Sequence, residues 1–180
     1  MASYYYLAAQ LPYLIYGQTV PMSSAAFKAL AGSLMGTSDA RMLDYCTLDP
    51  NPENGDSLTP SGFINQWREW ERVLRTNLAK GRAAKLKRES TLSASEYPAD
   101  AATVAAVALT MESPLEAEIY LDKARWDAIE YFQGINLFSE NAMYAYLLKL
   151  LLMERKMAFK TEEGFNEYKA LYSAILDLKT

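Results

Sequence analysis

Hydrophobic positions in this chain recur with helical spacing from about Ser23 onward. The clearest case begins near Pro60, where large apolar side chains follow one another at intervals of four, three, four and four residues. These side chains are Phe63, Trp67, Trp70, Leu74 and Leu78. Intervals of three and four place such side chains on one face of a helix. The pattern therefore predicts a long amphipathic helix with both tryptophans on its apolar face, which Gly81 is expected to weaken or end.

The same spacing predicts helices over most of the remaining chain. Ser23 or Ser24 can cap a helix that stops at Gly36, and Ser38 is predicted to cap a second, short helix. Later helices are predicted over about 99–111, 114–132, 139–159 and 162–178. Between these elements, the turn-rich residues 49–59 predict a loop and residues 92–98 predict a linker.

These elements predict an all-α fold, a single-domain helical bundle of six to eight helices that spans residues 1–180. Helix-favouring Ala, Leu, Glu, Lys and Arg dominate after Ser23. Tyr4–Leu7 is ambiguous because it is rich in β-favouring aromatic residues, and any short strand or irregular segment is confined to these N-terminal tyrosines.

The N-terminal segment is unusual because Met1–Phe27 contains no ionic side chain, and the first one is Lys28. Five of the 13 tyrosines lie in this segment: Tyr4, Tyr5, Tyr6, Tyr13 and Tyr16. Each large apolar side chain gains roughly 1.5–3 kcal/mol on burial. We therefore expect this segment to be docked, either in the core of the chain itself or against a partner.

The composition removes most catalytic arrangements. The chain has no histidine, so a Ser-His-Asp triad, a Cys-His pair and a histidine-containing zinc site are excluded. Its one cysteine, Cys46, has no base nearby in sequence, and a buried structural thiol is the expected role. No Gly-x-x-x-x-Gly-Lys-Ser/Thr phosphate loop is present. We therefore predict that the protein is not an enzyme and holds no cofactor or metal.

One group of carboxylates keeps a rival interpretation open. Glu112, Glu116, Glu118 and Asp122 lie close together in sequence, and Glu118 and Asp122 share a helix face. Such a pair could serve acid–base or metal chemistry. The favoured interpretation is that these acids stabilise the N-terminus of a helix that begins near Ser113.

Charge is distributed unevenly along the chain. Residues 68–88 hold eight basic and two acidic side chains, whereas the rest holds 10 basic and 20 acidic ones. Within this segment an arginine stripe is predicted beside Trp67 and Trp70, formed by Arg68, Arg72, Arg75 and Arg82. We predict that this stripe is a partner-binding surface and that Trp67 or Trp70 lies at its edge if either side chain is exposed. A solvated face neutralised by the chain's own acids and a nucleic-acid surface are the alternatives.

The apolar run Ala142–Met153 contains one charge, Lys149. It predicts a helix at the centre of a core or between subunits, with Lys149 reaching solvent or pairing with an acid. At 12 residues it is too short to span a membrane, which needs about 20. The expected location is cytoplasmic, with any contact to a membrane made through a membrane-bound complex.

Several stretches occur in a recognisable order. They are Tyr4-Tyr-Tyr-Leu-Ala-Ala9, then Ser24–Leu34 and Thr37–Cys46, and finally Tyr146–Met157. Together they resemble the C-type subunit of archaeal and bacterial V-type ATPases, whose eukaryotic counterpart is the d-type subunit. The opening Ser3–Pro12 is closer still to a short bacterial family encoded beside V-type ATPase genes.

The resemblance implies a non-catalytic helical component or assembly factor of a rotary ATPase. Such a component couples the central stalk to the membrane rotor ring, its partners are other subunits of the ATPase, and ATP chemistry lies elsewhere. The family's C-type subunit is longer and has three similar helical domains, of which this chain could supply one and part of another. The late motif also has Lys149-Leu150 in place of Lys-Glu. The alternatives are an unrelated cytosolic protein-interaction module and a helical nucleic-acid-binding protein that uses residues 68–88.

Overall fold

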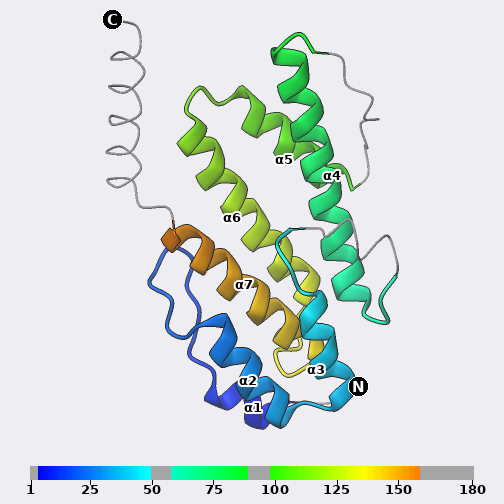
Figure 1. Ribbon diagram of the computed structural model, residues 1–180, viewed down its shortest axis with the longest axis vertical. Coiled ribbons are helices and arrows are strands. Elements are labelled where there is room, and N and C mark those ends of the chain that lie inside the picture. Colours follow the sequence, from blue (N-terminus) through cyan, green and yellow to red (C-terminus); the bar gives the residue numbers. More distant parts are fainter. Residues whose placement is uncertain (1–3, 50–57, 89–97, 159–180) are drawn as a thin grey trace, which may run out of the picture.

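The computed structural model describes residues 4–49, 58–88 and 98–158 (Figure 1). Within these residues the chain forms seven α-helices and one short 3-10 helix, and no strand, so the all-α prediction is confirmed. The helices are α1 (Tyr5–Gln10), α2 (Ser24–Leu34), α3 (Thr37–Met42), α4 (Gly62–Lys85), α5 (Ala99–Thr110), α6 (Pro114–Gln133) and α7 (Glu140–Ala158), and the 3-10 helix (Leu43–Tyr45) follows α3. The helix expected over 162–178, and most of the predicted loop and linker, lie outside the described residues.

Helices α4, α5, α6 and α7 make up the body of the molecule, and α1, α2 and α3 lie at one end of its long axis (Figure 1). Helix α5 runs parallel to α4, because Trp70 contacts Asp100 near the start of α5 while Gly81 faces Leu109 near its end. Helix α6 returns antiparallel to both, and α7 is antiparallel to α6.

Serine side chains cap the starts of α2, α4 and α6. The hydroxyl of Ser23 accepts a hydrogen bond from the Ala26 backbone N–H, and Ser61 and Ser113 cap α4 and α6 in the same way. Such caps satisfy one of the backbone donors that a helix start leaves free. The helix boundaries predicted from sequence therefore agree with the structure to within about two residues, a normal margin for helix ends.

One local prediction is wrong, because Ser38 lies inside α3, whose N-cap is Gly36 without a side-chain hydrogen bond. The segment that was ambiguous from the sequence forms a helix: Tyr4 is the N-cap of α1, and Tyr5–Leu7 lie in its first turn. A strand needs a neighbouring strand to satisfy its backbone, and the described residues provide none, whereas a helix satisfies its backbone internally. The N–H of Tyr4 donates to the carbonyl oxygen of Phe138 at 2.7 Å, which fixes this end of the chain to the α6–α7 connection.

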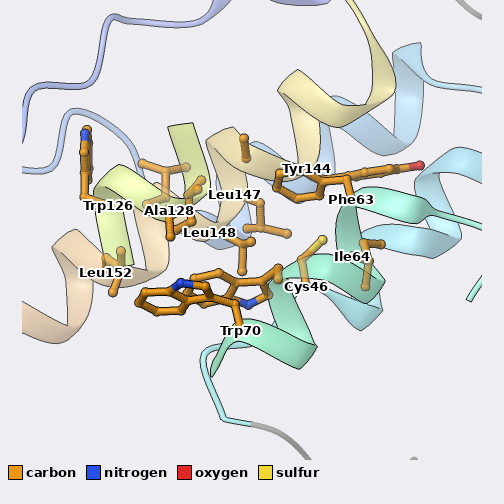
Figure 2. Close-up of a cluster of buried hydrophobic side chains, with 14 of the residues drawn as sticks. Cys46, Phe63, Ile64, Trp70, Trp126, Ala128, Tyr144, Leu147, Leu148 and Leu152 are labelled. Atoms are coloured by element: carbon orange, nitrogen blue, oxygen red, sulfur yellow. The ribbon is translucent and has the colours of Figure 1, made fainter. Parts of the chain in front are cut away.

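The core is one hydrophobic cluster to which every helix except α3 contributes buried side chains. The apolar face of α4 is fully buried, and the rings of Trp67 and Trp70 stack at 5.9 Å between centroids. Figure 2 shows Trp70 in the same cluster as Tyr144 and Leu148 of α7. Helix α7 is thus a central core helix. The ammonium of Lys149 pairs with Glu130 at 3.0 Å.

Gly81 does not end α4, which continues to Lys85. It lies where α4 packs against α5, and a Cβ added at Gly81 would stand 3.2 Å from Cγ of Leu109, with the δ carbons closer still. The absence of a side chain lets the two helices approach closely.

We expect Gly81→Ala to destabilise the protein by about 1 kcal/mol. Alanine gains about 1 kcal/mol of helix propensity over glycine, but overpacking against Leu109 costs about 1–3 kcal/mol. In a Leu109→Ala background the same substitution should stabilise by about 1 kcal/mol, because the obstruction is gone. Urea unfolding of the four proteins measures this reversal of sign. Stabilisation by Gly81→Ala alone would contradict close packing at this position.

Candidate partner-binding surfaces

The first two residues of the arginine stripe engage neighbouring groups of the chain. The guanidinium of Arg68 donates to the backbone oxygen of Tyr45 at 3.3 Å and lies 5.2 Å from the centroid of its ring. Arg72 forms two hydrogen bonds to the carboxylate of Glu69, at 2.5 and 2.9 Å. The charge of Arg72 is therefore matched within its own helix.

The other two residues of the stripe also meet acidic side chains. Arg75 donates to Glu71 at 2.7 Å and to Asp49 at 2.6 Å, and these contacts raise its pKa although partial burial opposes them. Arg82 lies 3.6 Å from Glu118. The arrangement matches the alternative of a face neutralised by the chain's own acids, and three of the four arginines have their charge countered by carboxylates.

The two tryptophans proposed for the edge of this surface are internal. Trp67 and Trp70 are each 1% exposed. Their indole N–H groups are also engaged, that of Trp67 by the backbone oxygen of Thr47 and that of Trp70 by the carboxylate of Asp100. Because both belong to the apolar face of α4, their large rings serve the core, and neither is available to a partner.

The carboxylate group of α6 takes part in a buried ion network. Arg155 of α7 contacts both Asp122 and Glu118, which share a helix face as predicted. Asp122, 7% exposed, also accepts from Arg125 at 3.2 Å, and Arg125 in turn pairs with Glu71 of α4 at 3.0 Å. The network joins three helices through opposite charges, which is a structural arrangement.

The remaining acids of this group lie outside the network. Glu112 and Glu116 are exposed, and Glu116 is in the first turn of α6, where an acid favours the helix dipole. Within the described residues no three side chains of the types His, Cys, Asp and Glu are grouped to hold a metal ion.

Cys46 is a buried thiol, 2% exposed, at the end of the 3-10 helix. Burial raises its pKa from 9.0 to about 12, although the charges of Lys28 and Arg68 act in the opposite direction. A thiolate is the reactive form of cysteine, so this residue is poorly suited to nucleophilic chemistry at neutral pH.

Exposed apolar side chains lie on three adjoining segments at the N-terminal end of the molecule: α1, the residues after it and the α6–α7 connection. We call this the aromatic surface, and it consists of Tyr5, Tyr6, Tyr13, Ile135, Leu137 and Phe138. Tyr6, Tyr13 and Ile135 are 72%, 87% and 100% exposed. The rings of Tyr5 and Phe138 lie 4.3 Å apart and bring α1 against the α6–α7 connection. Exposed apolar residues that gather in this way are typical of an interaction site.

A groove of about 490 Å³ opens beside the aromatic surface. The N-terminal segment forms one wall, with Leu11 and Tyr13, and the α6–α7 connection forms the other, with Leu137 and Phe138. Its polar side is the Lys149–Glu130 ion pair. Partial burial opposes ionisation of Glu130, but the hydrogen bond and charge of Lys149 lower its pKa.

Part of this surface follows from the sequence. The absence of charge before Lys28 predicts a docked N-terminus, whereas the helical spacing assigns no role to the α6–α7 connection, which carries Ile135, Leu137 and Phe138. Apolar residues in a connection between two helices were the missed signal, because connections usually carry polar residues.

Comparison of the chain with protein-family models, with curated proteins and with solved structures finds no match. None of the helices in the described part of the chain is long and apolar enough to cross a membrane. The fold and its surfaces thus define a helical bundle with an exposed aromatic end.

Proposed function

We propose that this chain is a non-catalytic component or assembly factor of a V-type rotary ATPase, similar to the C-type subunit, and that it binds a protein partner through the aromatic surface. The resemblance of its sequence to that subunit supplies the identity of the complex. The proposed site of contact is formed by the exposed side chains of the aromatic surface.

The proposal is supported by the way in which the resembling stretches pack against one another. The Tyr146 hydroxyl of α7 donates to the backbone oxygen of Pro12 at 2.8 Å. The carboxylate of Glu154 accepts from both the backbone N–H and the hydroxyl of Ser24, each at 2.7 Å. Stretches at least 130 residues apart in sequence thus pack against one another in the folded chain.

The aromatic surface is the observation that carries the proposed site. Tyrosine presents a large apolar ring with a polar tip and few rotatable bonds, so it loses little entropy when it binds. Tyr13 and Leu137 border the same groove, which offers a partner side chain a partly enclosed seat. A cytosolic protein-interaction module unrelated to the ATPase would use the same surface. The identity of the captured partner distinguishes the two functions.

We expect the tagged protein to capture V-type ATPase subunits from its own host, and the triple variant Tyr6→Ser, Tyr13→Ser, Ile135→Ser to lose at least about tenfold of that capture. Interface hot spots cost about 2 kcal/mol or more on truncation, so one hot spot among the three suffices. Quantitative mass spectrometry of the captured subunits measures the loss. All three positions are highly exposed, so the variant should keep its fold within about 0.5 kcal/mol per site.

The matched control is a triple variant that removes three exposed apolar side chains outside the aromatic surface: Leu58→Ser, Leu115→Ser, Met157→Ser. It should capture as well as the unchanged protein. Specific capture of a partner other than ATPase subunits would favour the unrelated interaction module. Equal loss in both triple variants would remove the aromatic surface as the site.

A further inference from the structure

The end of α4 that lies opposite the aromatic surface is strongly basic (Figure 1). Of the eight basic side chains in residues 68–88, the first three belong to the arginine stripe and are engaged as described above. The last five are exposed, and we call them the basic end of α4: Lys80, Arg82, Lys85, Lys87 and Arg88. Leu86 lies among them and is 65% exposed.

Most of this charge has no counter-charge among the described residues. Within the described residues, the side chains of Lys80, Lys87 and Arg88 make no hydrogen bond or ion pair. The pair between Arg82 and Glu118 spans 3.6 Å with both side chains about half exposed, and exposed pairs of this kind bind weakly. Arg72 and Arg75 are thus closely paired with acids, whereas Lys80, Lys87 and Arg88 at the end of α4 have no such partner among the described residues.

The helix terminus itself gives a second observation. The N–H groups of Lys87 and Arg88 donate to the oxygens of Ala84 and Ala83, each at 3.0 Å, and Lys87 has φ of 52°. Glycine is the usual residue at such a left-handed position, where a side chain is disfavoured. The helix dipole favours basic side chains only within the last turn, which leaves Lys80 unexplained. Lys87 thus lies at the end of α4 with an exposed side chain that has no ion pair among the described residues.

We propose that the basic end of α4 is a second docking surface and that it binds an acidic segment of a partner protein. This surface is separate from the aromatic surface and does not depend on the function proposed above. Leu86, between Lys85 and Lys87 in the sequence, is exposed and offers an apolar contact, which suits a peptide carrying both acids and an apolar side chain.

The surroundings favour a short acidic segment over an extended polyanion. Glu112, Glu116 and Glu118 are exposed on and before the start of α6, and Glu118 lies next to the basic end at Arg82. A lipid bilayer or a nucleic-acid duplex would meet these acids together with the basic residues, and the repulsion would offset the attraction. A short peptide can contact the five basic side chains without approaching these acids.

The test measures binding of a fluorescein-labelled oligoglutamate peptide with a central leucine to the full chain by fluorescence anisotropy. We expect saturable binding that weakens as salt is added. The triple variant Lys80→Gln, Lys87→Gln, Arg88→Gln should bind about tenfold more weakly, the loss expected for three exposed ion pairs. The charge-matched variant Lys28→Gln, Arg41→Gln, Lys123→Gln carries the same net charge and should bind as the unchanged protein does.

Two further probes decide between classes of partner. Vesicles of equal parts phosphatidylserine and phosphatidylcholine and a short DNA duplex are titrated under the same conditions. Tighter binding of either probe than of the peptide would overturn the proposal. So would absence of peptide binding, or equal loss in the two triple variants. Circular dichroism of both variants establishes that the helices are retained, so that a lost fold cannot pass for a lost site.

Discussion

Replacing Arg125 with methionine is expected to lower the free energy of unfolding by about 3 kcal/mol, the lower end of the cost of breaking a buried ion pair. Arg125 is 5% exposed and donates to Glu71 at 3.0 Å and to Asp122 at 3.2 Å. Glu71 is 1% exposed, so its carboxylate cannot turn to water when the guanidinium is removed. The Glu71 carboxylate keeps its ion pair with Arg75 at 2.7 Å, so the loss should lie at the lower end of the range for a broken buried ion pair.

The matched control on the same helix is Lys123→Met. Lys123 pairs with Asp127, but both side chains are about half exposed, so the loss should stay below about 1 kcal/mol. Adding Glu71→Gln to Arg125→Met should restore at most about 1 kcal/mol, because a neutral amide is less costly to bury than a carboxylate left with Arg75 as its one close cation. Denaturant unfolding of the set gives these differences. Equal losses for Arg125→Met and Lys123→Met would mean that water reaches the network in the folded protein.

The helices could be predicted because their signals are local. The apolar face of α4 follows from the spacing of Phe63, Trp67 and Trp70, and the starts of α2 and α6 follow from Ser23 and Ser113. Each of these features involves residues within about one or two helical turns, which the sequence displays directly. The error at Ser38 and the ambiguity at Tyr4–Leu7 are also local, because the residue types at these positions occur both in helices and outside them.

The pairing of charges could not be predicted, because it depends on how helices are placed in space. Glu71 and Arg125 are 54 residues apart, and their contact arises only when α4 packs against α6. The same packing supplies Glu118 to Arg82. The basic segment could therefore be located from the sequence, but not which of its side chains the fold would neutralise.

The uncharged N-terminus was predicted to dock in the core or on a partner, and its side chains divide between core and solvent. Tyr4 and Leu7 are 8% and 1% exposed, whereas Tyr5 and Tyr6 are 60% and 72% exposed. Helix α1 turns one face to α2 and the α6–α7 connection and the other to solvent. A six-residue helix built almost wholly of apolar residues gives no contrast from which to choose the buried face.

Buried tyrosine hydroxyls and the buried thiol of Cys46 should make the folded protein unstable at alkaline pH. Burial raises the pKa of Tyr4 from 10.0 to about 12, with a contribution from its hydrogen bond to Asp39, and burial raises that of Tyr146 to about 12. The pKa of Tyr144 is raised in the same direction by burial, and that of Cys46 from 9.0 to about 12. In the unfolded chain these groups lose their protons near their ordinary values, so the folded state binds more protons between about pH 9 and pH 12.

Stability should therefore be complete below about pH 9 and fall as pH rises through 10 toward 12, by up to about 1.4 kcal/mol per pH unit for each of the four groups. We expect cooperative loss of the helical circular-dichroism signal in this range, together with phenolate absorbance from the buried tyrosines. Tyr146→Phe should unfold at higher pH because one of these groups no longer ionises. At neutral pH the same variant should lose about 1 kcal/mol with its hydrogen bond to Pro12. Full phenolate formation while the helical signal persists would show that water reaches these hydroxyls in the folded state, and that their burial does not hold the bundle together.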